Sequence, residues 1–282
     1  MKTPSFLSAC CLSGCLILAG ALSAQYETVK KKPGSVEKFP WPKGIRGAVS
    51  LTFDDARLSQ VDTLIPILER RGVKATFYVS LDRVMERLEG WKKAIQAGHE
   101  IGNHTMTHPC TGNYPAFRWN SLEELTLDGM AREIDDAEQA IFRTLGVKPR
   151  SFAYPCGQTF VGRGREVKSY VPLVAERFMT GRKWLNEDAN DPAFCDLAQL
   201  LAFESDGQPF EALKSLLDKA AAEGRWLILV GHEVGDGGYQ TTPVSSIEKL
   251  CRYTQDPANG IRLDTVGAIA DYIVAAREKK IR

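Results

Sequence analysis

The stretch AVSLTFDDARLSQVDTLIPILERRGVKATFYV, residues 48–79, decides the fold of this chain. It begins with an apolar run over residues 48–53, which predicts a buried strand. Apolar residues then recur at helical spacing over residues 61–68, and Gly72 ends this pattern. Residues 73–79 form a second apolar run and predict the next strand. A strand, a helix and a strand in this order imply two parallel strands joined by a right-handed crossover.

The same alternation of strands and helices continues toward the end of the chain. We expect further strands over residues 99–103, 150–154 and 226–230. We expect helices over residues 81–97, 121–145, 210–222, 247–253 and 266–276, the second of them opened by Ser121 and Glu124 at capping-box spacing. Residues 109–120 and 157–169 are expected to be loops. The pattern predicts an α/β fold, either a barrel or an open parallel sheet.

Residues that carry chemistry follow four of these predicted strands. The four histidines of the chain fall into only two segments, GHEIGNHTMTH at residues 98–108 and LILVGH at residues 227–232. In parallel α/β folds the carboxyl ends of the strands meet at one edge, where reacting groups lie. We therefore expect one common site, formed by the residues that follow these strands: Asp54, Asp55, His104, His108, Pro155, Cys156 and His232.

One carboxylate and two imidazoles in this set predict a metal site. Asp55, His104 and His108 are ligand types that suit Zn²⁺ or a similar divalent ion, and three protein ligands leave a position open, as catalytic sites do. Because the two histidines are four residues apart, we expect them to share one face of a helical turn. Pro109 disfavours helix at His108 and is expected to end that turn.

The chain resembles the polysaccharide deacetylases of the NodB-homology type, which are metal-dependent carbohydrate esterases. The resemblance covers roughly residues 46–276 and is carried by five segments in the family's order. They are TFDD at 52–55, GVKATFYV at 72–79, GHEIGNHTMTH at 98–108, FAYPCG at 152–157 and LILVGH at 227–232. The resemblance implies a deformed (β/α) barrel that removes acetyl groups from an N-acetylated polysaccharide or oligosaccharide.

The resemblance also implies roles for the residues that match the family's motifs. Asp55, His104 and His108 would hold a divalent ion, Zn²⁺ in the first place, with Co²⁺ or Ni²⁺ as alternatives. Asp54 would be the general base, and His232 would be the general acid that protonates the departing sugar amine or hydroxyl.

The FAYPCG segment departs from the family's pattern. Many members have an arginine where this chain has Ala153, and an aromatic residue often stands where it has Cys156. The match still implies that the backbone N–H of Cys156 stabilises the oxyanion and that Tyr154 and Pro155 adjoin the substrate. Because a carboxylate base beside a dication needs an orienting partner, we predict that Arg182 lies within salt-bridge distance of the base.

The resemblance leaves the partner of the acid histidine and the polymer open. The family's aspartate that polarises this histidine has no clear match, and Asp188, Asp191 and Asp196 remain alternatives. The FAYP form is similar to the branch that acts on poly-N-acetylglucosamine-like exopolysaccharide, which does not fix the substrate. Three aromatic residues of the loop over 109–120 could stack on sugar faces or could pin the loop: Tyr114, Phe117 and Trp119.

Other functions are compatible with the same residues. One is removal of O-acetyl groups from xylan-like polymers, and another is hydrolysis of small linear or cyclic amides. A carbohydrate-binding protein without catalysis would need neither the base Asp54 nor the acid His232, so the sequence favours an enzyme.

Residues 1–24 predict a secretion signal, with Lys2 as the only charge, a mostly apolar stretch and small residues before Gln25. Within it, Leu12 to Cys15 resembles a bacterial lipoprotein processing site, which would tether the protein to the envelope. Otherwise the protein would be secreted or periplasmic. We expect residues 25–44 to be a polar lead-in and residues 45–282 to be the catalytic domain.

The charge of the chain limits the kinds of partner that we expect it to bind. Without residues 1–24 the chain has 36 − 1 = 35 basic and 35 acidic residues, which predicts no basic surface for nucleic acid. No stable protein partner is predicted.

Four cysteines remain after removal of residues 1–24, which allow three pairings, and we expect buried thiols or one disulfide rather than metal ligands. They are Cys110, Cys156, Cys195 and Cys251.

Overall fold

The computed structural model describes residues 38–184 and 187–281. The predicted signal peptide, the lipoprotein alternative at Cys15 and most of the predicted lead-in lie outside these ranges. The last part of the lead-in packs on the domain, because Trp41 stacks on Tyr272 with ring centroids 5.7 Å apart and donates its indole N–H to the Gly224 carbonyl. Within the described ranges, no helix is long and apolar enough to cross a lipid bilayer.

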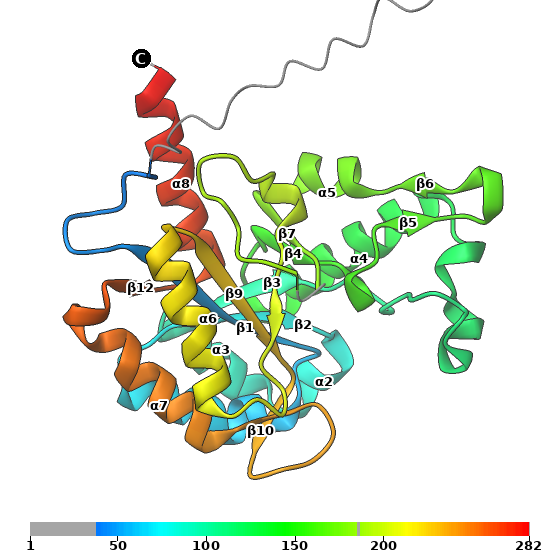
Figure 1. The fold of residues 1–282 in the computed structure, drawn as a ribbon. Coiled ribbons are helices and arrows are strands. Elements are labelled where there is room, and N and C mark those ends of the chain that lie inside the picture. The colour runs from blue at the N-terminus through cyan, green and yellow to red at the C-terminus, as the bar shows by residue number, and fades with distance from the viewer. Residues whose placement is uncertain (1–37, 185–186, 282) are drawn as a thin grey trace, which may run out of the picture. The chain divides into compact units, whose positions relative to one another are not determined.

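One parallel sheet of eight strands organises the domain (Figure 1). The order is β7-β4-β3-β2-β1-β9-β8, and β12 pairs with the first residues of β1. The bounds are β1 Gly47–Asp54, β2 Thr76–Val79, β3 Glu100–Asn103, β4 Ser151–Ala153, β7 Thr180–Arg182, β8 Phe203–Glu204, β9 Trp226–Gly231 and β12 Ile261–Leu263. Leu200, which precedes β8, forms a single bridge with Arg182 at the end of β7. The two edges of the sheet therefore approach each other without a continuous ladder, as in an incomplete barrel.

Strand β1 shows why this sheet is buried on both faces. Val49, Leu51 and Phe53 pack into one hydrophobic cluster, whereas Ala48 packs into a second cluster. Every residue of β1 is buried, as is typical of a parallel strand covered by helices on both sides. The polar Thr52 fits because its hydroxyl donates to the Leu229 carbonyl of β9 at 2.8 Å.

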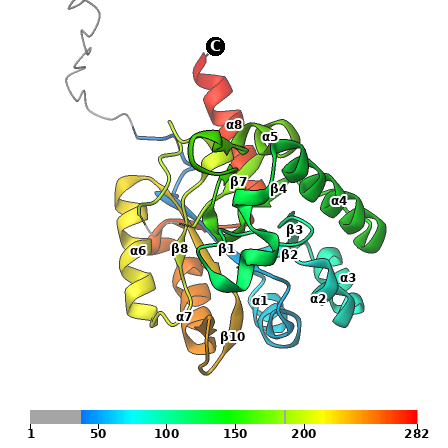
Figure 2. The same cartoon turned by 90° about the vertical axis from the view of Figure 1, so that its right-hand side faces the viewer.

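Eight α-helices of the described chain surround the sheet (Figures 1 and 2). They are α1 Ile65–Arg70, α2 Leu81–Glu86, α3 Leu88–Gln96, α4 Leu127–Leu145, α5 Val171–Arg177, α6 Phe210–Glu223, α7 Val244–Gln255 and α8 Val266–Ile281. The first cluster takes residues from α1, α3, α6 and α7, the second takes them from α8, and a third joins α4 and α5 to β4. This arrangement confirms the predicted deformed (β/α) barrel.

The helix predicted over 81–97 is in fact two helices, since the backbone leaves helical geometry at Arg87, which lies between α2 and α3. The helix predicted to begin at Ser121 begins at Leu127, with Thr126 as the N-cap that accepts the Gly129 N–H. Glu124 does not serve a capping box at Ser121 because its carboxylate pairs with Arg163 at 2.5 Å.

The loop predicted over 157–169 contains a small antiparallel pair, β5 Phe160–Val161 and β6 Lys168–Ser169. A second small sheet follows β9 and is formed by β10 Glu233–Gly235 and β11 Thr241–Pro243. These strands of two or three residues are too short to give a periodic sequence pattern.

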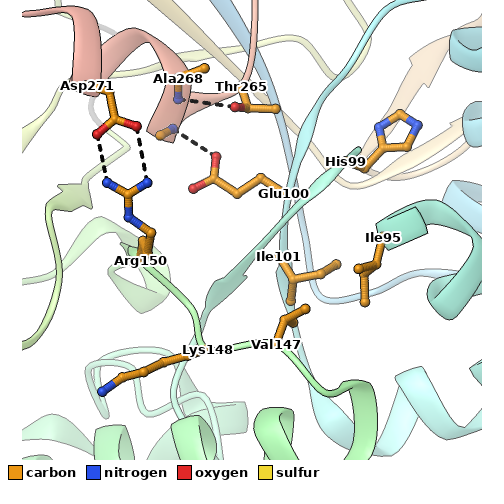
Figure 3. Close-up of a pocket in the computed structure, with 11 residues that line it drawn as sticks. Ile95, His99, Glu100, Ile101, Val147, Lys148, Arg150, Thr265, Ala268 and Asp271 are labelled. Atoms are coloured by element: carbon orange, nitrogen blue, oxygen red, sulfur yellow. Dashed lines mark hydrogen bonds and ion pairs between the residues drawn. The ribbon is translucent and has the colours of Figure 1, made fainter. Parts of the chain in front are cut away.

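A cavity of about 360 Å³ lies at the amino ends of β3 and β4 (Figure 3). Arg150 closes it through an ion pair with Asp271 of α8, and Glu100 accepts the Gly267 N–H at the start of α8. His99 also lines it and accepts the Ala75 N–H on Nδ1. Since the chemistry-bearing residues follow the carboxyl ends of the strands, this cavity belongs to the opposite end of the barrel.

Candidate metal centre and active site

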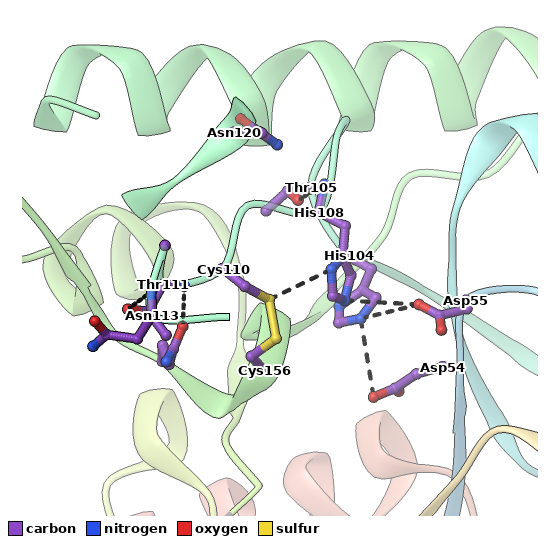
Figure 4. Close-up of a disulfide and its surroundings, with 12 residues drawn as sticks. Asp54, Asp55, His104, Thr105, His108, Cys110, Thr111, Asn113, Asn120 and Cys156 are labelled. Carbon is purple, nitrogen blue, oxygen red and sulfur yellow. Dashed lines mark hydrogen bonds and ion pairs between the residues drawn. A yellow bond between two sulfur atoms is a disulfide. The ribbon is translucent and has the colours of Figure 1, made fainter. Parts of the chain in front are cut away.

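The ends of β1 and β3 bring the predicted metal ligands together (Figure 4). Asp55 follows β1, and His104 follows β3. The Nε2 atoms of His104 and His108 each lie 3.7 Å from Oδ1 of Asp55. One ligand atom from each of the three side chains lies within 4.8 Å of the others, so the three could hold a single ion.

The two histidines are not on a helical turn, so that prediction was wrong. Residues 104–108 are irregular, and the backbones of Thr105 and His108 are left-handed, with φ of 64° and 54°. Asn103 accepts the Thr105 N–H at 2.8 Å, and Thr105 accepts the His108 N–H at 3.1 Å. These side-chain hydrogen bonds replace the helical ones, and Pro109 keeps His108 out of the right-handed helical region.

The protonation states of these side chains fit a divalent ion. His104 Nδ1 lies 2.9 Å from the Ala153 carbonyl, which assigns the proton to Nδ1 and leaves the Nε2 lone pair facing Asp55. Burial, helped by the charge of His104, lowers the pKa of His108 to about 4, so its imidazole is neutral at pH 7. Burial raises the pKa of Asp55, but the electrostatic attraction of the carboxylate to His104, His108, His232 and Arg57 outweighs burial and lowers this pKa to about 2.

Arg182 lies where the sequence predicted, against Asp54. Its Nη2 is 2.6 Å from both carboxylate oxygens, and both side chains are buried. Since β7 and β1 are separated by three strands in the sheet, the guanidinium spans the curved interior of the barrel. It also lies over the Tyr78 ring of β2, 4.9 Å from its centroid. The contact therefore depends on the curvature of the sheet.

The partner of the candidate acid histidine was predicted wrongly. His232 Nδ1 lies 2.6 Å from Oδ2 of Asp206, which follows the short strand β8. The three predicted alternatives make other contacts: Asp188 pairs with Lys219 and Arg225, and Asp191 and Asp196 accept local backbone N–H groups. Because β8 and β9 are parallel neighbours, Asp206 and His232 emerge side by side. With only two residues, β8 gave no strand pattern that could have pointed to Asp206.

The electrostatics of His232 suit a proton donor. Burial lowers the pKa of this imidazole, but the hydrogen bond to Asp206 and the charge of Asp54 raise it more, so the pKa lies above its ordinary value. The Thr242 hydroxyl also donates to Asp206 at 2.7 Å, which fixes the carboxylate. His232 therefore has a held orientation and an increased share of the protonated form.

The residues after β4 differ in how far they can reach a substrate. The side chain of Tyr154 is buried, donates its hydroxyl to the Ala198 carbonyl and packs on Phe152, so the structure does not bring it to the site as predicted. Pro155 is also buried, whereas Cys156 is partly exposed and has a left-handed backbone with φ of 52°. Cys156 is therefore the residue of this segment that can meet a substrate.

One disulfide is present in the described chain, between Cys110 and Cys156, with Cα atoms 6.0 Å apart. Cys195 and Cys251 are free thiols. We predicted buried thiols or one disulfide. The Cys110–Cys156 disulfide and the thiol of Cys251, which is buried in the core, confirm this prediction for three of the four cysteines.

Two further residues hold the site, and no sequence pattern pointed to them. Arg57 donates to Oδ2 of Asp55 at 2.9 Å, which leaves Oδ1 facing the histidines. The buried Gln60 amide donates to the backbone carbonyls of Asp54 and His232, at 2.7 and 2.9 Å. Gln60 therefore ties the end of β1 to the end of β9.

Comparisons with known proteins assign part of the chain to a family. Residues 43–169 match the profile of the family described as polysaccharide deacetylase. This part of the chain belongs to the polysaccharide deacetylase family. It contains Asp54, Asp55, His104, His108 and Cys156, whereas Arg182, Asp206 and His232 lie beyond the matched residues.

Individual relatives match part of this chain. It is 31% identical to the YlxY protein of Bacillus subtilis over 124 residues, 44% of this chain and 33% of that protein. It is 29% identical to chitin deacetylase 1 of Cryptococcus neoformans over 144 residues, 50% of this chain and 28% of that protein. The chain thus spans a third or less of the length of these relatives. A solved structure from Mycobacterium smegmatis matches with a TM-score of 0.61 at 17% identity. The match covers 84% of this chain and 93% of the solved chain, so the two chains share a fold.

Proposed function

We propose that this protein is a metal-dependent hydrolase that removes acetyl groups from N-acetylated glycans. The observation that carries the proposal is the cluster of Asp55, His104 and His108, with Asp54 4.0 Å from His104 and with His232 near enough to Asp54 and Asp55 to feel their charges. Membership of the polysaccharide deacetylase family supports the reaction class. The name of the relative from Cryptococcus neoformans, a chitin deacetylase, supports an N-acetylated polymer as the substrate class.

The residues around the cluster divide the work of amide hydrolysis. A divalent ion, Zn²⁺ by its ligand types, would supply a Lewis acid and lower the pKa of water. Asp54 accepts the proton of the attacking water, and Arg182 holds the Asp54 carboxylate in place. The backbone N–H of Cys156 stabilises the oxyanion. His232 gives its proton to the departing amine while Asp206 stabilises the imidazolium.

The aromatic loop beside the cluster supports a glycan over a small amide. The ring centroid of Phe117 lies 5.9 Å from that of His108 and 6.5 Å from that of Tyr114. Of the two roles considered for the aromatic residues, we assign Phe117 to holding the loop in place. Trp119 is 76% exposed and Tyr114 is 53% exposed. Tyrosine and tryptophan rings are common in binding surfaces because they combine an apolar face with a polar group. We assign them to sugar units next to the one being deacetylated.

We place this activity outside the cytoplasm. The predicted signal in residues 1–24 supports this, as does the Cys110–Cys156 disulfide, since disulfides persist in oxidising compartments. Anchoring through Cys15 is the alternative form of the same proposal.

Acetate release from a panel of substrates tests the proposed function. Chitooligosaccharides and peptidoglycan represent N-acetylated glycans, acetylated xylan represents O-acetyl polymers, and acetamide represents small amides. We expect release from the first group, loss of release with a chelator and recovery with added Zn²⁺ or Co²⁺. Release from acetylated xylan alone would favour the O-acetyl alternative. Chelator-resistant release, or hydrolysis of small amides alone, would contradict the proposal.

His232→Ala is expected to affect substrates according to their leaving groups. An amide needs a protonated nitrogen to leave, whereas an aryl acetate releases a phenolate that needs no proton. Removing the acid should therefore lower kcat/KM for an N-acetylglucosamine oligomer about 10²–10⁴-fold and for an aryl acetate much less. Circular dichroism and metal content of the variant control for folding and ion binding. Equal losses on both substrates would mean that His232 is not the acid.

Asp206→Asn is expected to move the alkaline limb of the pH profile of kcat. The acid must be protonated to act, so activity falls as the pH rises through the pKa of His232. Asp206 raises this pKa above its ordinary value, and its replacement should lower the pKa and shift the limb to lower pH. The profile is measured for both proteins with the same metal. An unmoved limb would contradict a role for this pair.

A further inference from the structure

The Cys110–Cys156 disulfide joins the two loops from which the site is built (Figure 4). Cys110 stands two residues after His108, in the loop that follows β3. Cys156 stands in the loop that follows β4, and Ala153 at the end of β4 accepts the Nδ1–H of His104. The covalent bond therefore connects the chain beside one proposed metal ligand to Cys156, whose backbone N–H is the proposed oxyanion donor.

The disulfide also touches the ligand itself. Cys110 Sγ lies 3.7 Å from Nδ1 of His108, while Nε2 of the same ring faces Asp55. If Nε2 binds the ion, Nδ1 carries the proton and the sulfur accepts it. The two histidines are then oriented alike: the Ala153 carbonyl accepts from His104, and a disulfide sulfur accepts from His108. Such contacts to the far nitrogen of a ligating histidine fix its tautomer and ring orientation.

The backbone at both ends of this connection needs support. His108 and Cys156 have left-handed φ values of 54° and 52°, which non-glycine residues keep only where the surroundings hold them. A noncovalent link between the same loops runs from the Thr111 N–H to the Gln158 side-chain carbonyl at 2.8 Å. This hydrogen bond keeps the loops near each other without the disulfide, but it contacts neither His108 nor Cys156.

We propose that the Cys110–Cys156 disulfide is a positioning element of the metal centre and that opening it lowers the affinity of the protein for its ion. The inference rests on the ligand set of the proposed function. A dithiol reductant opens the disulfide by supplying two electrons and two protons: the S–S bond breaks, two cysteine thiols form and the dithiol is oxidised to a disulfide. The metal affinity would then depend on the redox state of the compartment.

The test compares ion binding by three proteins. The variant Cys110→Ala/Cys156→Ala removes the disulfide without leaving a thiol near His108. The matched control, Cys195→Ala/Cys251→Ala, removes the two cysteines that are free within residues 38–184 and 187–281. Affinity for Zn²⁺ is measured by competition with a chromophoric chelator, and the d–d spectrum of added Co²⁺ reports the ligand geometry. We expect about 10–100-fold weaker binding in the first variant, as for other contacts that orient a ligand, and wild-type binding in the control.

A second measurement covers a failure of the first variant to fold. The wild-type protein is opened with a phosphine reductant and titrated with Mn²⁺, since thiolates compete less for this ion than for Zn²⁺. Reduction should weaken Mn²⁺ binding, and reoxidation should restore it.

The outcomes separate this inference from the proposed function. A purely structural disulfide would lower the melting temperature but leave the metal Kd and the Co²⁺ spectrum unchanged, which would overturn the inference alone. If the intact wild-type protein binds no ion, the ligand set is wrong and both fall. If ion binding depends on the disulfide but no glycan releases acetate, the inference stands and the proposed substrate class fails.

Discussion

His104→Ala is expected to yield a folded protein that has lost most of its bound divalent ion. The imidazole supplies one of three proposed ligands, and its Nε2 lies 3.7 Å from the Asp55 carboxylate. Two remaining protein ligands are fewer than catalytic metal sites use, so activity should fall with the metal. Metal content per chain, measured by mass spectrometry after purification without chelators, gives the result directly.

The natural control for His104→Ala is His99→Ala. His99 precedes the same strand, β3, but lies at its other end, where it accepts the Ala75 N–H. This variant should retain about one ion per chain, whatever it loses in stability. If His104→Ala also retains a full ion and chelators leave its activity intact, the proposed ligand set is wrong.

The ligand set could be predicted because it depends on features that a sequence displays. Asp55 and His104 each follow a segment that the alternation of strands and helices predicts to be a strand, and the ends of parallel strands meet at one edge of a sheet. The local path between His104 and His108 could not be predicted from spacing, because Asn103 and Thr105 replace the helical hydrogen bonds with their own side chains. The predicted helical turn and the observed irregular segment both bring the rings of His104 and His108 together.

A contact between distant segments could be predicted only where the chemistry of a residue required a partner. An arginine was expected against Asp54 because the FAYPCG segment has Ala153 in place of one, and Arg182 fills that place from across the barrel. Asp206 was missed because its position depends on pairing of β8 with β9, and a two-residue strand leaves no periodic pattern. The Cys110–Cys156 pairing also depends on which loops meet in space, which four cysteines alone leave open.

Asp54→Asn is the change that separates the base from the ligands. Asp54 and Asp55 are adjacent, yet their side chains lie in different surroundings. Asp55 faces both histidines at 3.7 Å, whereas Asp54 is held by Arg182 at 2.6 Å and lies 4.0 Å from His104. An asparagine at position 54 keeps the shape and one oxygen for Arg182 but cannot take a proton. We therefore expect turnover to fall about 10²–10⁴-fold while the ion is retained.

Asp55→Asn is the matched comparison, because it makes the same chemical change one residue along the chain. It removes the negative charge that two imidazoles and Arg57 surround, so it should weaken ion binding itself. Excess Zn²⁺ or Co²⁺ should then restore part of the activity of Asp55→Asn and none of that of Asp54→Asn. Equal loss of metal in the two variants would show that both carboxylates bind the ion. In that case the proton of the attacking water would have to go to another group, and His232, already the proposed acid, would be the first to examine.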